Sequence, residues 1–309
     1  MTVNINTNLY NKNVSTTIKL AKICINLEIN DRIPTYELLS KQINVARGTI
    51  QNSMKVLEEN KAIKLVSKGH LGTFIIEKDF AKLLHFTNIK YVLGSMPLPY
   101  SAKFEGLCTG LVASLENNYG LTCNMTYMRD AVERIEMLLK DRCDFVVCSK
   151  NSANIAIAEG KNVAIALEFS EGSYMKAIGL VFHSSFNKEI KDGMKVGIVQ
   201  NKSPLRDVVL NVVKGYDVQL VDIAQSEMIK ELKKGSIDVT VWNKDELDNK
   251  IAINNFCEIK EINSDELVAC IVIKKEKKEI YKLINTLIDI NKVEKIQEKV
   301  VRGEMTPKY

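Results

Sequence analysis

Apolar side chains recur at helical spacing in the first sixty residues, and the pattern predicts three short helices. The first begins near Ser15 and ends before Asn30-Asp31, where two turn-forming residues break the periodicity. Thr35 is a suitable N-cap for a second helix over residues 36–42. After a tight turn, a third helix is predicted from about residue 46 to residue 60.

The third predicted helix is polar at its start, and the preceding turn is only three or four residues long. This is the arrangement of a helix-turn-helix motif, whose second helix enters the major groove of DNA. Residues 62–76 then alternate between apolar and polar and contain a glycine-rich turn at 69–72. The alternation predicts a β-hairpin, which would form the wing of a winged helix-turn-helix.

Beyond residue 89 the pattern changes to strands alternating with helices, which is typical of an α/β domain. Two such blocks predict a two-lobed domain, and strand-like segments at 174–182 and 267–274 are natural crossovers between the lobes. The predicted domains are a winged helix-turn-helix at 1–76, a helical connector at 77–88 and an effector domain at 89–309, with lobe I at about 89–168 and 275–309 and lobe II at about 183–266.

Positive charge is concentrated in the first 88 residues, which hold 12 Lys and Arg against 7 Asp and Glu. The remaining 221 residues are electrically balanced, so the whole net charge of +5 belongs to the predicted DNA-binding module. Such a concentration suits a partner rich in phosphate, although a solvated surface would give the same count.

No apolar segment resembles a secretion signal or a membrane span, so we expect a cytoplasmic protein without membrane contact. The seven cysteines are scattered and include no Cys-x-x-Cys pair. We therefore expect buried free thiols, with neither a disulfide framework nor a metal site, and no cofactor.

The order of residues 33–76 resembles the GntR-type winged helix. The resemblance rests on Ile33-Pro-Thr, Val45-Ala-Arg-Gly-Thr-Ile50, Leu57-Glu-Glu and Gly72-Thr-Phe-Ile75. It implies that Arg47, Thr49, Gly69, His70 and Gly72 contact DNA, and the expected interface is completed by Thr35, Gln51, Asn52 and Lys68.

Two positions depart from the GntR-type pattern, because Glu37 and Gln51 stand where arginine is usual in that family. Arginine reads guanine, whereas glutamine prefers the adenine edge. A different operator sequence is therefore expected.

The element order after residue 89 resembles the type II periplasmic-binding-protein fold, which also serves as the effector domain of LysR-type regulators. The segments Asp144-Phe-Val-Val and Asp238-Val-Thr-Val occupy equivalent places in the two blocks. With its GntR-like head, the whole chain is similar to the YhfZ family of regulators.

Ligands of such folds bind beyond the carboxyl ends of the strands, between the lobes. The candidate ligand-binding residues are Ser95, Met96, Pro97, Tyr100, Ser101, Ser149 and Asn151 from lobe I and Lys202, Ser203, Arg206, Trp242 and Asn243 from lobe II. The turn at 201–204 places Lys202 beside a helix start, which favours an anionic ligand, but Ser-Pro is also ordinary helix-start chemistry. Trp242 suits a protein core as well as a pocket wall.

The sequence therefore predicts a ligand-responsive, homodimeric regulator that binds double-stranded operator DNA and a small-molecule effector. One alternative keeps DNA binding and treats the C-terminal domain as a dimerisation scaffold. An enzyme is the weaker alternative, because His70, His85 and His183 form no catalytic set and no nucleophile elbow or P-loop is present. We expect no catalytic activity.

Overall fold

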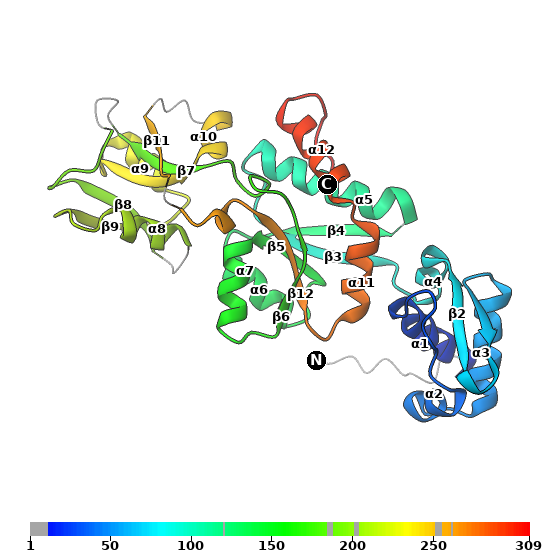
Figure 1. The fold of residues 1–309 in the computed structure, drawn as a ribbon. Helices are drawn as coiled ribbons and strands as arrows, with labels where there is room; N and C mark the ends of the chain where they lie inside the picture. The colour runs from blue at the N-terminus through cyan, green and yellow to red at the C-terminus, as the bar shows by residue number, and fades with distance from the viewer. Residues whose placement is uncertain (1–11, 120, 184–187, 201–203, 251–254, 261) are drawn as a thin grey trace. The chain divides into compact units, whose positions relative to one another are not determined.

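The computed structural model describes residues 12–119, 121–183, 188–200, 204–250, 255–260 and 262–309. The chain divides into two compact units, the first of which contains the N-terminal segment through Val92. Most of the remaining chain forms the second unit. The elements of the N-terminal segment, the head, are α1 (Lys12–Asn26), α2 (Tyr36–Ile43), α3 (Arg47–Glu59), β1 (Ile63–Ser67), a 3₁₀ turn (Gly69–Leu71), β2 (Thr73–Lys78) and α4 (Phe80–Phe86) (Figure 1).

The turn between α2 and α3 is fixed by local chemistry. The Thr35 hydroxyl accepts a hydrogen bond from the Leu38 amide at 3.2 Å, which confirms the predicted N-cap of α2. Asn44 ends this helix in the left-handed region, with φ 61°, so the chain reverses within three residues. The predicted helix-turn-helix and hairpin are therefore present in the head.

One apolar core holds the head together. It contains Leu20 and Ile25 of α1, Leu39 of α2 and Ile50 and Leu57 of α3, all nearly inaccessible to solvent. Helix α4, in the segment expected to be a connector, contributes the buried Leu83 to the same core. The connector helix is thus packed into the head.

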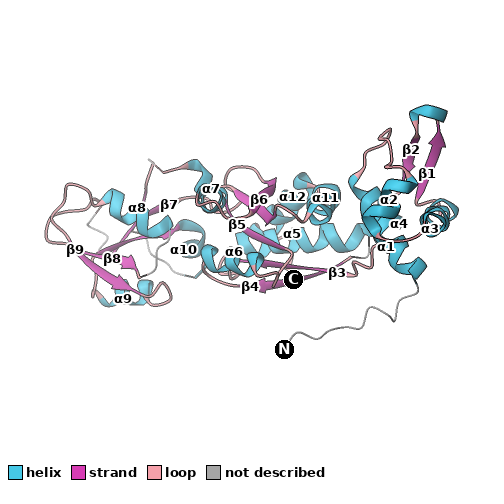
Figure 2. Cartoon of the chain, turned by 90° about the horizontal axis from the view of Figure 1, so that it is seen from below, coloured by secondary structure: helices cyan, strands magenta, loops and turns pink. Residues whose placement is uncertain are grey.

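The second unit contains two five-stranded sheets. Figure 2 draws the strands in magenta. The first has the order β4-β3-β5-β12-β6 and the second the order β11-β7-β10-β8-β9. In the first sheet β3 and β5 are parallel, whereas β12 is antiparallel to β5 and β6. In the second, β8 is parallel to β9 and β10, whereas β7 is antiparallel to β10. The strands are β3 (Tyr91–Met96), β4 (Thr122–Tyr127), β5 (Phe145–Ser149), β6 (Val163–Glu168), β7 (Ile178–Phe182), β8 (Lys195–Val199), β9 (Gln219–Ile223), β10 (Val239–Asn243), β11 (Phe256–Glu258) and β12 (Ala269–Lys274).

The chain passes between the sheets twice, from β6 to β7 and from β11 to β12, and the segments expected as crossovers, 174–182 and 267–274, contain β7 and β12. Helices α6 and α7 cover the first sheet, and α8 and α9 cover the second. The helices are α5 (Ala102–Tyr119), α6 (Ala131–Leu139), α7 (Lys150–Ala158), α8 (Pro204–Val212), α9 (Met228–Lys234), α10 (Lys244–Lys250), α11 (Lys278–Leu287) and α12 (Ile290–Val301), with a 3₁₀ turn at Ser264–Glu266. Helix α12 returns to the first lobe, where the backbone of Gln297 lies against Gly106 of α5.

Helices α7 and α10 were not predicted, because neither shows a clear apolar periodicity. Helix α7 depends instead on a cap, since the Ser149 hydroxyl accepts a hydrogen bond from the Ser152 amide at 3.2 Å. Within the described ranges, none of the helices combines the length and the apolar character needed to cross a bilayer.

Candidate functional site

Helix α3 separates an apolar side from a polar side. Ile50 and Leu57 are buried in the core of the head, whereas Arg47, Gln51 and Asn52 are exposed. These three side chains can donate to or accept from base edges in a major groove. Thr49, also predicted to contact DNA, is half-buried at the start of the helix.

The wing presents a second exposed group beyond β1. Lys68, Gly69 and His70 are exposed at the tip of the hairpin, and the Lys68 ammonium lies 4.7 Å from the centre of the Phe74 ring. Gly72 adopts φ 99° and lies against the Arg32 side chain. Thr35, which was also predicted to contact DNA, lies before α2, and its hydroxyl caps that helix.

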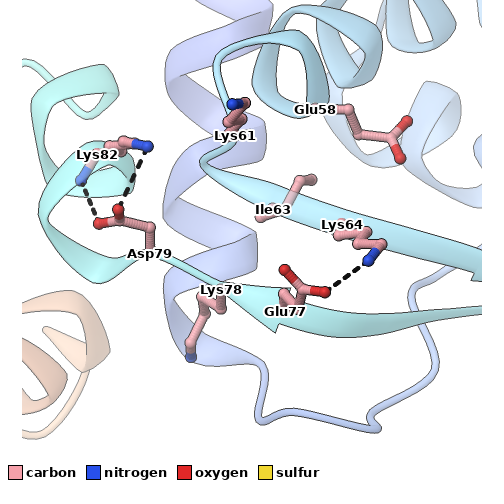
Figure 3. A pocket seen from close by; sticks show the side chains of 8 residues that line it. All are labelled: Glu58, Lys61, Ile63, Lys64, Glu77, Lys78, Asp79 and Lys82. Carbon is pink, nitrogen blue, oxygen red and sulfur yellow. Dashed lines mark hydrogen bonds and ion pairs between the residues drawn. The ribbon is translucent and has the colours of Figure 1, made fainter.

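A hollow of about 580 Å³ beside the hairpin is lined by Glu58, Lys61, Ile63, Lys64, Glu77, Lys78, Asp79 and Lys82 (Figure 3). Its charges are largely matched: Lys64 pairs with Glu77 at 2.6 Å and Lys82 pairs with Asp79 at 3.5 Å. The Lys78 ammonium points away from these pairs and donates to the carbonyl oxygens of Ile25, at 3.2 Å, and Leu27. Lys78 therefore closes the C-terminal end of α1, and this hollow offers little to an anion.

The second unit contains a larger cleft of about 900 Å³, within the range of small-molecule sites. Five predicted ligand-binding residues line it, namely Pro97, Tyr100, Ser149, Arg206 and Asn243. Five others do not, namely Ser95, Met96, Ser101, Asn151 and Trp242. Lys202 and Ser203 lie outside the described residues.

The predicted residues that do not line the cleft have other environments. Trp242 is 5% exposed and packs in the core of the second lobe with Val181 and Leu232. Ser95 and Met96 at the end of β3 are completely buried. The Asn151 amide donates a hydrogen bond to Glu266, which does line the cleft, at 2.7 Å.

Arg134 lines the cleft and was not predicted from the sequence. Its side chain is fully buried on α6. One terminal nitrogen, Nη1, donates to the carbonyl oxygens of Met128 at 2.5 Å and Arg129 at 2.8 Å, and the other, Nη2, donates to the Tyr174 hydroxyl at 3.4 Å. Nε has no hydrogen-bond partner among the described residues.

Glu266 is a second lining residue that the sequence did not indicate. Glu266 is 5% exposed, and its carboxylate accepts hydrogen bonds from the Ser149 hydroxyl at 3.0 Å and from the Asn151 amide. Burial raises the pKa of this carboxyl, and the two hydrogen bonds oppose part of that shift. Ser149 thus lines the cleft itself, and both Ser149 and Asn151 hold the Glu266 carboxylate.

The rest of the cleft is lined by charged side chains of both signs and by apolar side chains. The Arg129 guanidinium lies 4.5 Å from the centre of the Tyr100 ring and also donates to its hydroxyl. Arg206 is held by the carboxylate of Asp222 at 2.7 Å. The remaining lining includes acidic side chains, such as Asp207 and Glu246, and the apolar side chains Val132, Ile155 and Leu210.

Two family profiles cover most of the chain. Residues 28–75 match a helix-turn-helix domain, and residues 79–309 match the YhfZ C-terminal domain. Protein YhfZ of Escherichia coli (strain K12) is 27% identical over 296 residues, which are 94% of this chain and 95% of that protein.

Solved structures support the same assignment. The crystal structure of YhfZ from Shigella flexneri has a TM-score of 0.61 and 25% identity, covering 74% of this chain and 97% of that one. The methionine-binding protein MetQ has a TM-score of 0.52 and 15% identity, covering 72% of this chain and 99% of that one, and it shows the fold alone. The second unit thus has a periplasmic-binding-protein-like fold. With a helix-turn-helix domain ahead of it, the chain belongs to the YhfZ C-terminal domain family.

Proposed function

We propose that this protein is a homodimeric transcriptional regulator whose affinity for operator DNA changes when a small molecule binds the cleft of its second unit. The observation that carries the proposal is the presence, in one chain, of an exposed polar face on α3 and a ligand-sized cleft containing a buried arginine with an unused donor. Such a cleft suits a metabolite, and the name of the fold neighbour MetQ supports a ligand of amino-acid size.

A non-catalytic role fits the chemistry of the cleft. None of the three histidines lines it, and His183 is instead engaged with the Leu232 carbonyl at 2.7 Å. Across the described parts of the chain, no group of three His, Cys, Asp or Glu side chains is arranged to hold a metal ion. Regulation therefore requires only that the ligand bind and alter the DNA affinity.

The DNA-binding part of the proposal is tested by selecting the full-length protein on random duplexes. We expect a two-fold sequence with half-sites about one helical turn apart, as a dimer of such modules requires. If no sequence is enriched at moderate salt, the proposal fails.

A pair of variants tests whether α3 reads sequence. Arg47→Ala should weaken binding to the selected sequence by roughly 5- to 150-fold, the range expected when one bidentate base contact is lost. It should weaken binding to random DNA much less. Arg142→Ala removes an exposed arginine of the second unit and should change neither affinity. Equal losses of Arg47→Ala on both DNAs would mean that Arg47 contacts only phosphate.

The regulatory part is tested by screening metabolites for thermal stabilisation and then measuring operator affinity with the stabilising compound. Coupling energies of about 1–3 kcal/mol are usual, and the coupling must be reciprocal. Operator DNA should therefore change the affinity for the compound by the same factor. A compound that binds the cleft without changing operator affinity would leave only the scaffold role for the second unit.

A further inference from the structure

We infer that the ligand of the cleft is a zwitterion with an apolar side group, an amino acid with an aliphatic or thioether side chain, whose carboxylate binds Arg134 and whose ammonium group binds Glu266. The inference rests on the proposed function, because it names the ligand class of the same cleft.

Arg134 is a buried cation with an unused hydrogen-bond donor. A guanidinium has five N–H donors, and a buried one normally pairs with a carboxylate. Arg134 is fully buried, yet it forms no ion pair in the described chain, and its hydrogen bonds go to two carbonyls and one tyrosine hydroxyl. The edge formed by Nε and Nη2 carries only the long 3.4 Å bond to Tyr174. That edge has the fork geometry that binds a carboxylate through two parallel hydrogen bonds.

Glu266 provides the opposite charge. Its carboxylate is buried, and both of its hydrogen-bond donors, Ser149 and Asn151, are neutral. No lysine or arginine forms an ion pair with it in the regions that the structure describes. A buried carboxylate with neutral partners only is stabilised by a cation, which a ligand ammonium would supply.

The two charged groups belong to one site. The Tyr174 hydroxyl accepts a hydrogen bond from Arg134 at 3.4 Å, and the Tyr174 amide donates to the carbonyl oxygen of Leu267, the residue after Glu266, at 2.9 Å. Arg134 and Glu266 nevertheless form no ion pair with each other. The same cleft therefore contains a cation and an anion that form no ion pair within the described chain, and a single molecule carrying both complementary charges would pair with both.

The walls indicate what else the ligand carries. Val132 is 47% exposed, Ile155 41% and Leu210 38%, and all three line the cleft. Large apolar side chains at this exposure in a concave site gain free energy when they contact an apolar ligand group. A purely polar zwitterion would leave them in water.

The test is calorimetric titration of the full-length protein with the L-amino acids that have apolar side chains. The tightest binder is then compared with its deaminated and its decarboxylated counterparts, which for leucine are 4-methylpentanoate and 3-methylbutylamine. We expect each counterpart to bind at least about tenfold more weakly, since each leaves one buried charge unpaired.

Variants separate the two charges. Glu266→Gln should weaken amino-acid binding by about tenfold or more and leave binding of the deaminated acid nearly unchanged. Glu171→Gln, which removes an exposed carboxylate away from the cleft, should leave both affinities unchanged. Arg134→Lys should weaken both ligands. If Arg134→Lys does not fold, the Glu266 comparison decides the matter alone.

Two results would overturn the inference without touching the proposed function. In one, the deaminated acid binds as tightly as the amino acid, which would make the cleft an anion site. In the other, no amino acid binds while another class of metabolite stabilises the protein and alters operator affinity. If no compound of a broad metabolite panel binds at all, the proposed function itself fails.

Discussion

Replacing Gly72 by alanine tests whether the wing depends on this glycine for its shape. Gly72 has φ 99° and ψ −166°, a combination that is essentially restricted to glycine. Holding another residue in such a region costs about 1–3 kcal/mol. An added Cβ would also meet the Arg32 side chain at 2.5 Å from Nε, so Arg32 would have to move.

The alanine is expected to destabilise the hairpin and the segment around Ile33 that is hydrogen-bonded to it. Around Gly72 the Lys68 amide donates to its carbonyl oxygen at 2.8 Å, and the Ile33 amide donates to Thr73 at 2.9 Å. A strain of about 1–3 kcal/mol would raise the open population of these hydrogen bonds by roughly 5- to 150-fold. Amide hydrogen exchange at Lys68 and Ile33 measures this increase directly in the full-length protein.

Gly48→Ala is the matched control. Gly48 lies in α3, where a Cβ would have no atom within 4 Å of it, and alanine is the better helix former by about 1 kcal/mol. The control should therefore slow exchange in α3. If Gly72→Ala left the exchange of the hairpin unchanged but weakened DNA binding, the structural argument would be wrong and Gly72 would be a position of close DNA approach.

Three further predictions follow from the contacts of single side chains. Lys78→Ala should lower the free energy of unfolding of the DNA-free protein by about 1–2 kcal/mol, because the carbonyls of Ile25 and Leu27 lose their donor. Thermal unfolding followed by circular dichroism measures the loss, and an unchanged melting temperature would refute it. Glu266→Gln should stabilise the ligand-free protein more at pH 7 than at pH 4.5, since a raised folded-state pKa means that stability falls as pH rises from the unfolded value through the folded one. Maleimide should label Cys257 far faster than the other six cysteines, which are buried, and burial raises the pKa of Cys24 to about 12; rapid labelling of a second thiol would contradict this.

The fold was largely predictable because it depends on local periodicity. The helix-turn-helix, the hairpin and both alternating blocks show a clear apolar pattern, and the crossovers are strand-like runs between blocks. The position of β12 inside the first sheet, between β5 and β6, depends on pairing over more than a hundred residues, which no local pattern records. The packing of α4 into the head was also not predictable, since the burial of Leu83 depends on helices that are distant in the sequence.

The cleft was less predictable, for reasons that differ between residues. Trp242 and Asn243 are neighbours in β10, and successive side chains of a strand face opposite sides, so only Asn243 can line the cleft. Arg134 gave one signal: it lies four residues before the buried Leu138, on the apolar side of α6. Glu266 gave none, because it reaches Ser149 only through the pairing of Ala269 with Ser149 in the sheet.

The energetics of the cleft connect its unpaired charges to regulation. A buried charge without a partner lowers the stability of a protein, and natural proteins retain such charges mainly at functional sites. In this chain the cost is concentrated at Arg134 and Glu266, whereas the buried polar side chains of the head, such as Thr16 and Ser53, are uncharged. A ligand that neutralises both charges stabilises the form that binds it, by about 2.7 kcal/mol at a hundred times its dissociation constant. Operator binding responds only to the extent that this stabilisation differs between the DNA-bound and the free protein, so the ratio of ligand affinities in those two states measures the regulatory effect.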